Sequence, residues 1–152
     1  MTIRTQSYEK RIDQLLKIAT AVKDDEVKAL LSNYICVLVS GYIETSIQDI
    51  ISEYTKPRSH GSVSGFVVGR LKRFTNANTE KIGNMLNNFN QDWKSSFDSM
   101  LTEERRSAIN SIVANRNLIA HGISTSISLR NVSEYYVRCK DVINEIESKI
   151  IK

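Results

Sequence analysis

Apolar residues recur at every third or fourth position along most of this chain, and that spacing limits its fold more than any other feature. In the first stretch they are Tyr8, Ile12, Leu15, Leu16, Ala19 and Val22. This is the pattern of one face of an amphipathic helix. The chain has one proline and six glycines, too few turn-forming residues for a protein built from many short strands. We predict an all-α fold: an up-and-down helical bundle with a long central helix and short accessory helices.

The longest predicted helix runs from about Asp25 to Tyr54, and apolar residues lie all around its cylinder. Such a helix is contacted on more than one side, so we expect it at the centre of the bundle. Residues 55–62 hold the only proline and predict a loop. Further helices are expected at about 63–74, 79–89 (capped by Thr79), 92–101, 103–121 (capped by Thr102 and stopped by Gly122) and from Ser128 or Asn131 to about 150. The best strand candidate, residues 123–129, alternates only weakly.

The length of 152 residues corresponds to one domain, so residues 1–152 are expected to form a single helical domain. The longest stretch without a charge, residues 29–43, contains two serines and an asparagine. It is too short and too polar to predict a membrane span, and no basic leader with an apolar segment precedes it. Cys36 and Cys139 lie in apolar, helix-like runs without a CxxC pair. We expect buried thiols and a reducing, cytoplasmic location.

Two charged residues lie where the helical spacing calls for apolar side chains. Arg116 continues the apolar stripe of its helix, and Glu44 lies among apolar neighbours on the long helix. Burying either charge costs several kcal/mol unless it is paired, so one interpretation is a Glu44–Arg116 ion pair that locks two core helices. At about 100° per residue, Asn117 and His121 are about 40° apart, and the long side chain of Arg116 can reach them. These three residues can therefore converge on one groove.

A second anomaly is the charge of residues 55–79, which contain no Asp or Glu. The basic residues there are Lys56, Arg58, Arg70, Lys72 and Arg73, in a chain of net charge +4. A phosphate backbone would be attracted to such a surface. A solvated basic face is the competing interpretation, and His60 in this segment is expected to be an exposed surface residue.

Residues 115–122 read NRNLIAHG, which resembles the RNxxxH signature of the HEPN superfamily, in its RNxIAHG form. The resemblance is to the RiboL-PSP-HEPN branch and extends over nearly the whole chain. Supporting segments are residues 40–46 (SGYIETS), Arg73-Phe74 with residues 80–82, and residues 132–136. The full string placed before a final helix, together with GYIE upstream, is more specific than the Arg–His spacing alone.

The resemblance implies an all-α bundle that usually dimerises, and many such proteins are metal-independent endoribonucleases of toxin–antitoxin, abortive-infection or CRISPR systems. It implies that Arg116 holds the scissile phosphate, His121 is the general acid or base, and Asn117 positions either group. Glu44 would orient Arg116. The 2′-hydroxyl of RNA is an internal nucleophile, so the implied chemistry needs no metal or cofactor. The implied partners are RNA, a second copy of the chain and an antitoxin protein.

The sequence departs from the family pattern at one position. Some HEPN toxins that are silenced by a nucleotidyltransferase carry a tyrosine two residues after the histidine, where this chain has Ile123. Regulation by adenylylation there is not expected. Because some superfamily members are inactive, the alternative function is a non-catalytic module that dimerises and binds a protein, nucleotide or nucleic acid. A metalloenzyme or Ser/His/Asp hydrolase is disfavoured by the presence of only two histidines and no GxSxG or HExxH string.

Overall fold

The computed structural model describes residues 1–151, and this part of the chain contains helices and no strands. The helices are α1 (Ile3–Ala21), α2 (Asp25–Thr55), α3 (Gly61–Leu71), α4 (Thr79–Phe89), α5 (Gln91–Met100), α6 (Glu103–Ala120) and α7 (Leu129–Glu145), with a 3-10 turn at Lys56–Arg58 and a π-helical turn at Ile146–Ile150. The predicted all-α fold is confirmed. Residues 123–128, the weak strand candidate, form a loop.

Side-chain caps set where the helices begin. Thr102 accepts a hydrogen bond from the Arg105 N–H and Ser128 accepts one from the Asn131 N–H, as the sequence predicts. The Thr79 prediction is wrong by one residue, because Asn78 supplies the cap of α4. Helix α3 begins two residues earlier than predicted, since the His60 ring nitrogen accepts from the Ser62 N–H. Each error arises where neighbouring polar residues could serve equally well as the cap.

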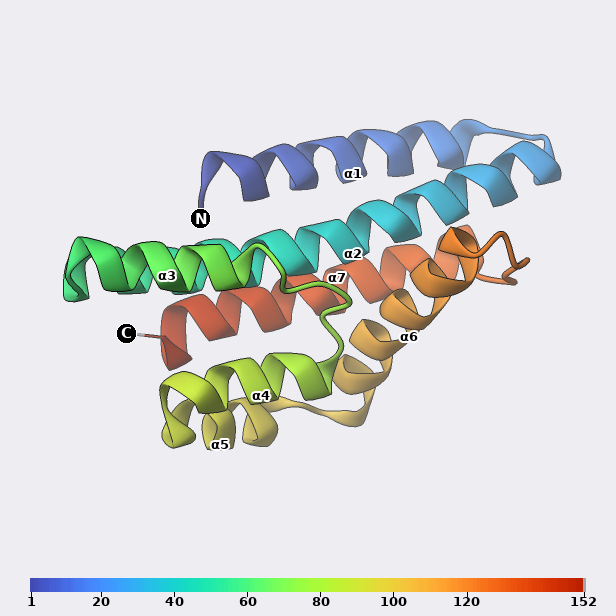
Figure 1. Cartoon of the computed structure of the whole chain (residues 1–152). Helices are drawn as coiled ribbons and strands as arrows, with labels where there is room; N and C mark the ends of the chain where they lie inside the picture. Colours follow the sequence, from blue (N-terminus) through green and yellow to red (C-terminus); the bar gives the residue numbers. More distant parts are fainter. Residues whose placement is uncertain (152) are drawn as a thin grey trace.

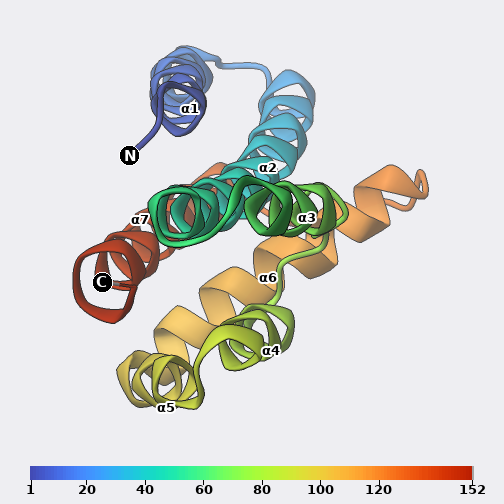
Figure 2. The same cartoon turned by 60° about the vertical axis from the view of Figure 1, so that its left-hand side comes forward.

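Helix α2 is the centre of the bundle (Figure 1). Helices α1, α6 and α7 pack against it, and α3 folds back along its second half. Its fully buried side chains include Ile35, Val39, Ile43 and Ile47. Figure 2 shows α4 and α5 as a pair beside the first half of α6, on the opposite side of the molecule from α1. The apolar residues all around α2 are therefore explained by neighbours on several sides.

The segment from Asp25 to Arg58 is long and apolar enough, by length and composition alone, to cross a membrane. In this structure more than half of its most apolar stretch is buried by the rest of the chain. Such burial is typical of the core helix of a bundle. A core helix and a membrane-spanning helix can have the same length and apolar composition.

Both cysteines are free and buried, as predicted. The Cys36 thiol donates to the carbonyl oxygen of Ile112 at 3.5 Å, which joins α2 to α6. Burial raises the pKa of the Cys36 thiol to about 12 and raises the pKa of Cys139 as well. Both thiols are therefore neutral at physiological pH, and they act as small core side chains.

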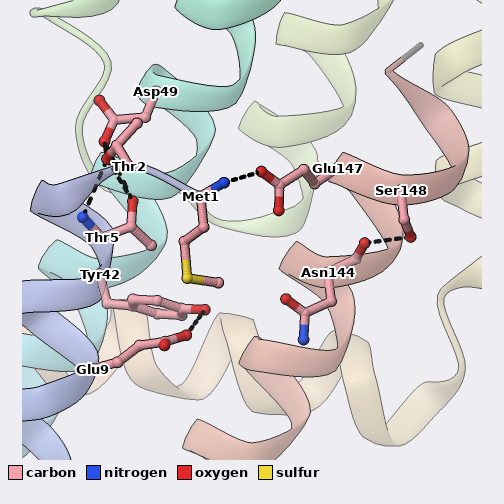
Figure 3. A network of polar contacts seen from close by, with 9 residues as sticks. All are labelled: Met1, Thr2, Thr5, Glu9, Tyr42, Asp49, Asn144, Glu147 and Ser148. Carbon is pink, nitrogen blue, oxygen red and sulfur yellow. Dashed lines mark hydrogen bonds and ion pairs between the residues drawn. The ribbon is translucent and has the colours of Figure 1, made fainter.

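A buried carboxylate fastens α1 to α2. Asp49 on α2 accepts hydrogen bonds from the hydroxyl groups of Thr2 and Thr5, the latter at 3.2 Å (Figure 3). Tyr42, also on α2, donates to Glu9 of α1 at 3.0 Å. The Asp49 carboxylate thus has partners for its buried oxygens, and it also binds the N-cap residue of α1.

Replacing Asp49 should destabilise the bundle. Asp49→Ala removes the acceptor that the Thr2 and Thr5 hydroxyl groups share and the carboxylate that pairs with Arg4 at 3.4 Å, so we expect a loss of about 2 kcal/mol in the free energy of unfolding. The melting temperature should fall by roughly 4–8 °C. The matched control is Glu53→Ala, one turn further along α2, where an exposed carboxylate pairs with Lys56 at 3.7 Å. We expect that variant to lose less than about 0.5 kcal/mol, and equal losses would contradict the role given to Asp49.

Candidate functional site

The candidate residues Arg116, Asn117 and His121 lie at the C-terminal end of α6. His121 is the first residue after the helix, and its N–H is bound by the carbonyl oxygens of Asn117 and Leu118, both at 3.2 Å. Gly122 follows with φ +70°, the left-handed conformation that ends many helices. The predicted stop at Gly122 is confirmed. It leaves the His121 side chain exposed at the rim of the helix end.

Arg116 is half-buried and its guanidinium is held by two amide oxygens. Its Nη1 lies 3.3 Å from Oδ1 of Asn117 and 3.5 Å from Oδ1 of Asn76. Asn76 belongs to the loop between α3 and α4. The structure thus brings Arg116 and Asn117 into contact, and it adds a residue from a different part of the chain.

Glu44 reaches the same loop residue from α2. Its Oε1 accepts a hydrogen bond from the backbone N–H of Asn76 at 2.6 Å. Glu44 and Arg116 form no direct ion pair within residues 1–151. The ion pair considered from the sequence is therefore replaced by an indirect link, with Asn76 bound by Glu44 through its backbone and by Arg116 through its side chain.

Asn76 is the residue that the sequence reasoning did not identify. Its φ of 53° makes it the one non-glycine residue with a positive φ in the described part of the chain. Asparagine tolerates this conformation better than most residues. The available signal was the pair of asparagines at 76 and 78 between two predicted helices, which indicates a special backbone conformation but not a tertiary contact.

The loop around Asn76 is anchored on both sides. Gln48 of α2 donates from Nε2 to the carbonyl oxygen of Phe74 at 3.1 Å. On the other side, Asn110 of α6 accepts from the backbone N–H and the hydroxyl of Thr79, at 3.0 and 3.1 Å. These contacts from α2 and α6 hold the loop in the position where Asn76 meets Arg116.

His121 differs from Arg116 in how it is held. Within residues 1–151 its imidazole has no hydrogen-bond partner, whereas Arg116 has two. Both side chains can be reached from solvent in a single copy of the chain. The end of α6 therefore presents an arginine held by two amide oxygens, with further N–H donors suited to phosphate binding, and an exposed imidazole five residues further along the chain.

The five predicted basic residues lie in two groups, one before α3 and one at its end. Lys56 pairs with Glu53 at 3.7 Å, and Arg58 donates to the Tyr54 carbonyl oxygen at 3.1 Å while lying 4.2 Å from the centre of the Tyr54 ring. Both lie before α3, which is eleven residues long. The other three, Arg70, Lys72 and Arg73, lie about 16 Å further on, at the end of α3 close to the loop that holds Asn76.

Metal-binding groups are not assembled in the described residues: no set of three or more His, Cys, Asp or Glu side chains there could hold a metal ion. The side chains that meet at the end of α6 are instead an arginine and two asparagines, and His121 follows them as an exposed residue at the helix end.

A comparison with known protein families matches residues 4–152 to the family model described as RiboL-PSP-HEPN. The matched region includes every candidate residue described above. Comparisons with curated proteins and with solved structures found no match.

The left-handed conformation of Asn76 gives a direct test of the loop. Asn76→Gly and Asn76→Ala both remove the amide that contacts Arg116, but only glycine adopts φ 53° without strain. We expect the alanine variant to be less stable than the glycine variant by about 1 kcal/mol in urea unfolding. Equal stability of the two variants would show that residue 76 does not keep the left-handed conformation once the amide is removed.

Proposed function

The chain belongs to the RiboL-PSP-HEPN family, and we propose that it is a metal-independent endoribonuclease that cuts RNA by attack of a 2′-hydroxyl on the adjacent phosphate. The family favours a nuclease or another RNA-related function. The observation that carries the proposal is the guanidinium of Arg116, held by Asn76 and Asn117 five residues from the exposed His121.

In the proposed reaction the 2′-oxygen forms a bond to phosphorus while the bond from phosphorus to the 5′-oxygen breaks. The products are a 2′,3′-cyclic phosphate and a 5′-hydroxyl. His121 takes the proton of the 2′-hydroxyl or gives one to the leaving oxygen. Arg116 stabilises the negative charge that develops on the phosphate oxygens.

Asn76, Asn117 and Glu44 have supporting roles in this proposal. Asn76 and Asn117 accept hydrogen bonds from Nη1 of Arg116, so the other N–H groups of the guanidinium remain for phosphate. Glu44 binds the backbone of Asn76 and acts through it as a positioning residue.

We further propose that two copies pair at the end of the molecule that carries the site. The first half of α2 exposes Val27, Leu30 and Tyr34 at helical spacing, with Leu30 64% exposed. Leu118 and Ile123 are also exposed, at the end of α6 and just after it. Figure 1 shows the start of α2 and the end of α6 at the same end of the bundle. A cluster of exposed apolar residues of this kind is typical of a protein–protein interface.

The biological setting remains part of the proposal: a toxin or defence component in the cytoplasm, silenced by a partner protein. The alternative is a non-catalytic binding module of the same fold. The observation that favours it is the imidazole of His121, which within the described residues has no partner to set its orientation.

The cleavage reaction can be tested with the two histidines as a matched pair. Purified protein should cut single-stranded RNA in the presence of EDTA and leave 2′,3′-cyclic phosphate ends. We expect His121→Asn to reduce the rate by about 100-fold or more. His60→Asn is the control, because His60 is the chain's only other histidine and asparagine can also cap α3. Unchanged cleavage by His121→Asn would reject the assignment.

A similar pair tests the arginine. Arg116→Ala should abolish cleavage, whereas Arg106→Ala, which removes an exposed arginine from the same helix, should leave the rate within about twofold. Comparable loss of activity in both variants would indicate a general effect of charge and not a role for Arg116 at the phosphate.

The proposed pairing of two copies predicts a dimer in size-exclusion chromatography with light scattering. Leu30→Asp should dissociate it, because a carboxylate would be buried without a partner. Ile3→Asp changes a residue that is 86% exposed at the other end of the molecule and should leave the dimer intact. A monomeric wild-type chain, or a Leu30→Asp variant that remains dimeric, would overturn this interface.

A further inference from the structure

A groove of about 610 Å³ lies between α3 and α4, outside the residues assigned above to cleavage. Its volume falls within the roughly 300–1,000 Å³ typical of ligand sites. Apolar side chains form much of its wall, among them Phe66 and Val67 of α3 and Met85 and Phe89 of α4. Phe66 is 70% exposed, which is unusual for a phenylalanine that serves only the fold.

The polar lining of the groove has one sign of charge. Arg70, Arg73 and Lys81 line it, and no carboxylate does within residues 1–151. Asn84 and Asn88 add exposed amide groups that can donate and accept hydrogen bonds. A ligand that fits this lining has a flat or apolar part, hydrogen-bonding edges and negative charge.

The groove adjoins the candidate cleavage site. Thr75 lines the groove, and the next residue, Asn76, contacts Arg116. Lys81 donates from Nζ to the carbonyl oxygen of Thr75 at 3.1 Å, so one of the groove's cations is fixed at the loop that joins the two sites. A strand held at Arg116 could therefore continue directly into the groove.

Phe89, which lines the groove, also packs against Trp93. Its ring stacks on Trp93 with the ring centres 6.1 Å apart and the planes at 20°, and Trp93 meets Tyr54 edge to face at 4.9 Å. Trp93 is the only tryptophan of the chain. A ring that stacks on Phe89 from the groove would thus change the surroundings of the only tryptophan, whose emission can be recorded selectively.

We propose that this groove binds a single-stranded segment of the RNA substrate, with a base on the exposed aromatic surface and phosphates at Arg70, Arg73 and Lys81. The proposal rests on the proposed function, because the bound segment is the continuation of the strand that is cut at Arg116. Aromatic stacking beside a basic lining is the usual way in which proteins hold single-stranded nucleic acid.

The test measures binding separately from cleavage. The probe is a single-stranded 2′-O-methyl oligonucleotide, which lacks the attacking hydroxyl and so cannot be cut. We expect it to bind the wild-type chain in fluorescence anisotropy and to change the emission of Trp93. Phe66→Ala and Lys81→Gln should each weaken binding by about fivefold or more. Lys81→Gln should also lower the slope of log K against log salt concentration by about 0.7.

The controls are Ile18→Ala, which removes an exposed apolar side chain from α1, and Lys17→Gln, which makes the same change of charge on that helix. They should leave the dissociation constant within about twofold. Wild-type affinity in Phe66→Ala and Lys81→Gln would overturn the proposal. The proposal would also be overturned if the emission of Trp93 changed when an acidic helical peptide was added but not when the oligonucleotide was added.

Cleavage of unmodified RNA then separates the two proposals. If both proposals hold, the groove variants should cut a dinucleotide as fast as the wild type does. With a long RNA, they should need a higher RNA concentration than the wild type to reach half of their maximal rate. If the wild type and the groove variants cut long RNA equally well at the same RNA concentrations, the groove proposal alone would be rejected. A wild-type chain that binds the oligonucleotide through the groove, yet cuts no RNA, would support the groove and reject the nuclease.

Discussion

One loop residue, Asn76, is bound by a carboxylate from α2 and by a guanidinium from α6, and the geometry of the candidate site depends on this shared contact. Its electrostatic consequence is important. A direct ion pair between Glu44 and Arg116 would neutralise much of the charge that a phosphate has to meet. Amide oxygens are neutral acceptors, so they hold the guanidinium in place without a directly paired carboxylate. The arrangement positions Arg116 and leaves N–H groups of the guanidinium for an anion.

The same helix that carries Glu44 performs three tasks along its length. The middle of α2 is buried on several sides, its second half fastens α1 through Asp49, and its first half exposes Leu30 and Tyr34. Apolar residues recur at helical spacing along the whole of α2, so a local sequence pattern does not distinguish these three regions. This is why α2 also satisfies the length and composition of a membrane-spanning helix, although the structure places it in the core.

The sequence predicts those features that are determined within one turn of a helix. The cap at Thr102 and the stop at Gly122 depend on neighbours three or four residues away, and both are found as predicted. The contacts of Asn76 join it to residues 32 and 40 positions away, and they require a left-handed backbone. No periodic pattern encodes such contacts. Arg116 and Asn117 are adjacent in the chain, so their contact needs no long-range information, whereas the catalytic roles remain predictions drawn from the family resemblance.

The basic residues of the segment 55–79 differ in how they are engaged, which a count of charges along the chain does not reveal. Residues 55–79 look like one cationic surface in the sequence, but Lys56 has an acidic neighbour in Glu53 and Arg58 is directed onto Tyr54. Cations engaged in this way gain less from an added phosphate, because part of their interaction is already made. Arg70 and Arg73 instead share a groove with Lys81, which lies outside that segment. The surface available to a phosphate backbone is therefore the groove that α3 and α4 line together, and one of its lining residues, Thr75, directly precedes Asn76, which contacts Arg116.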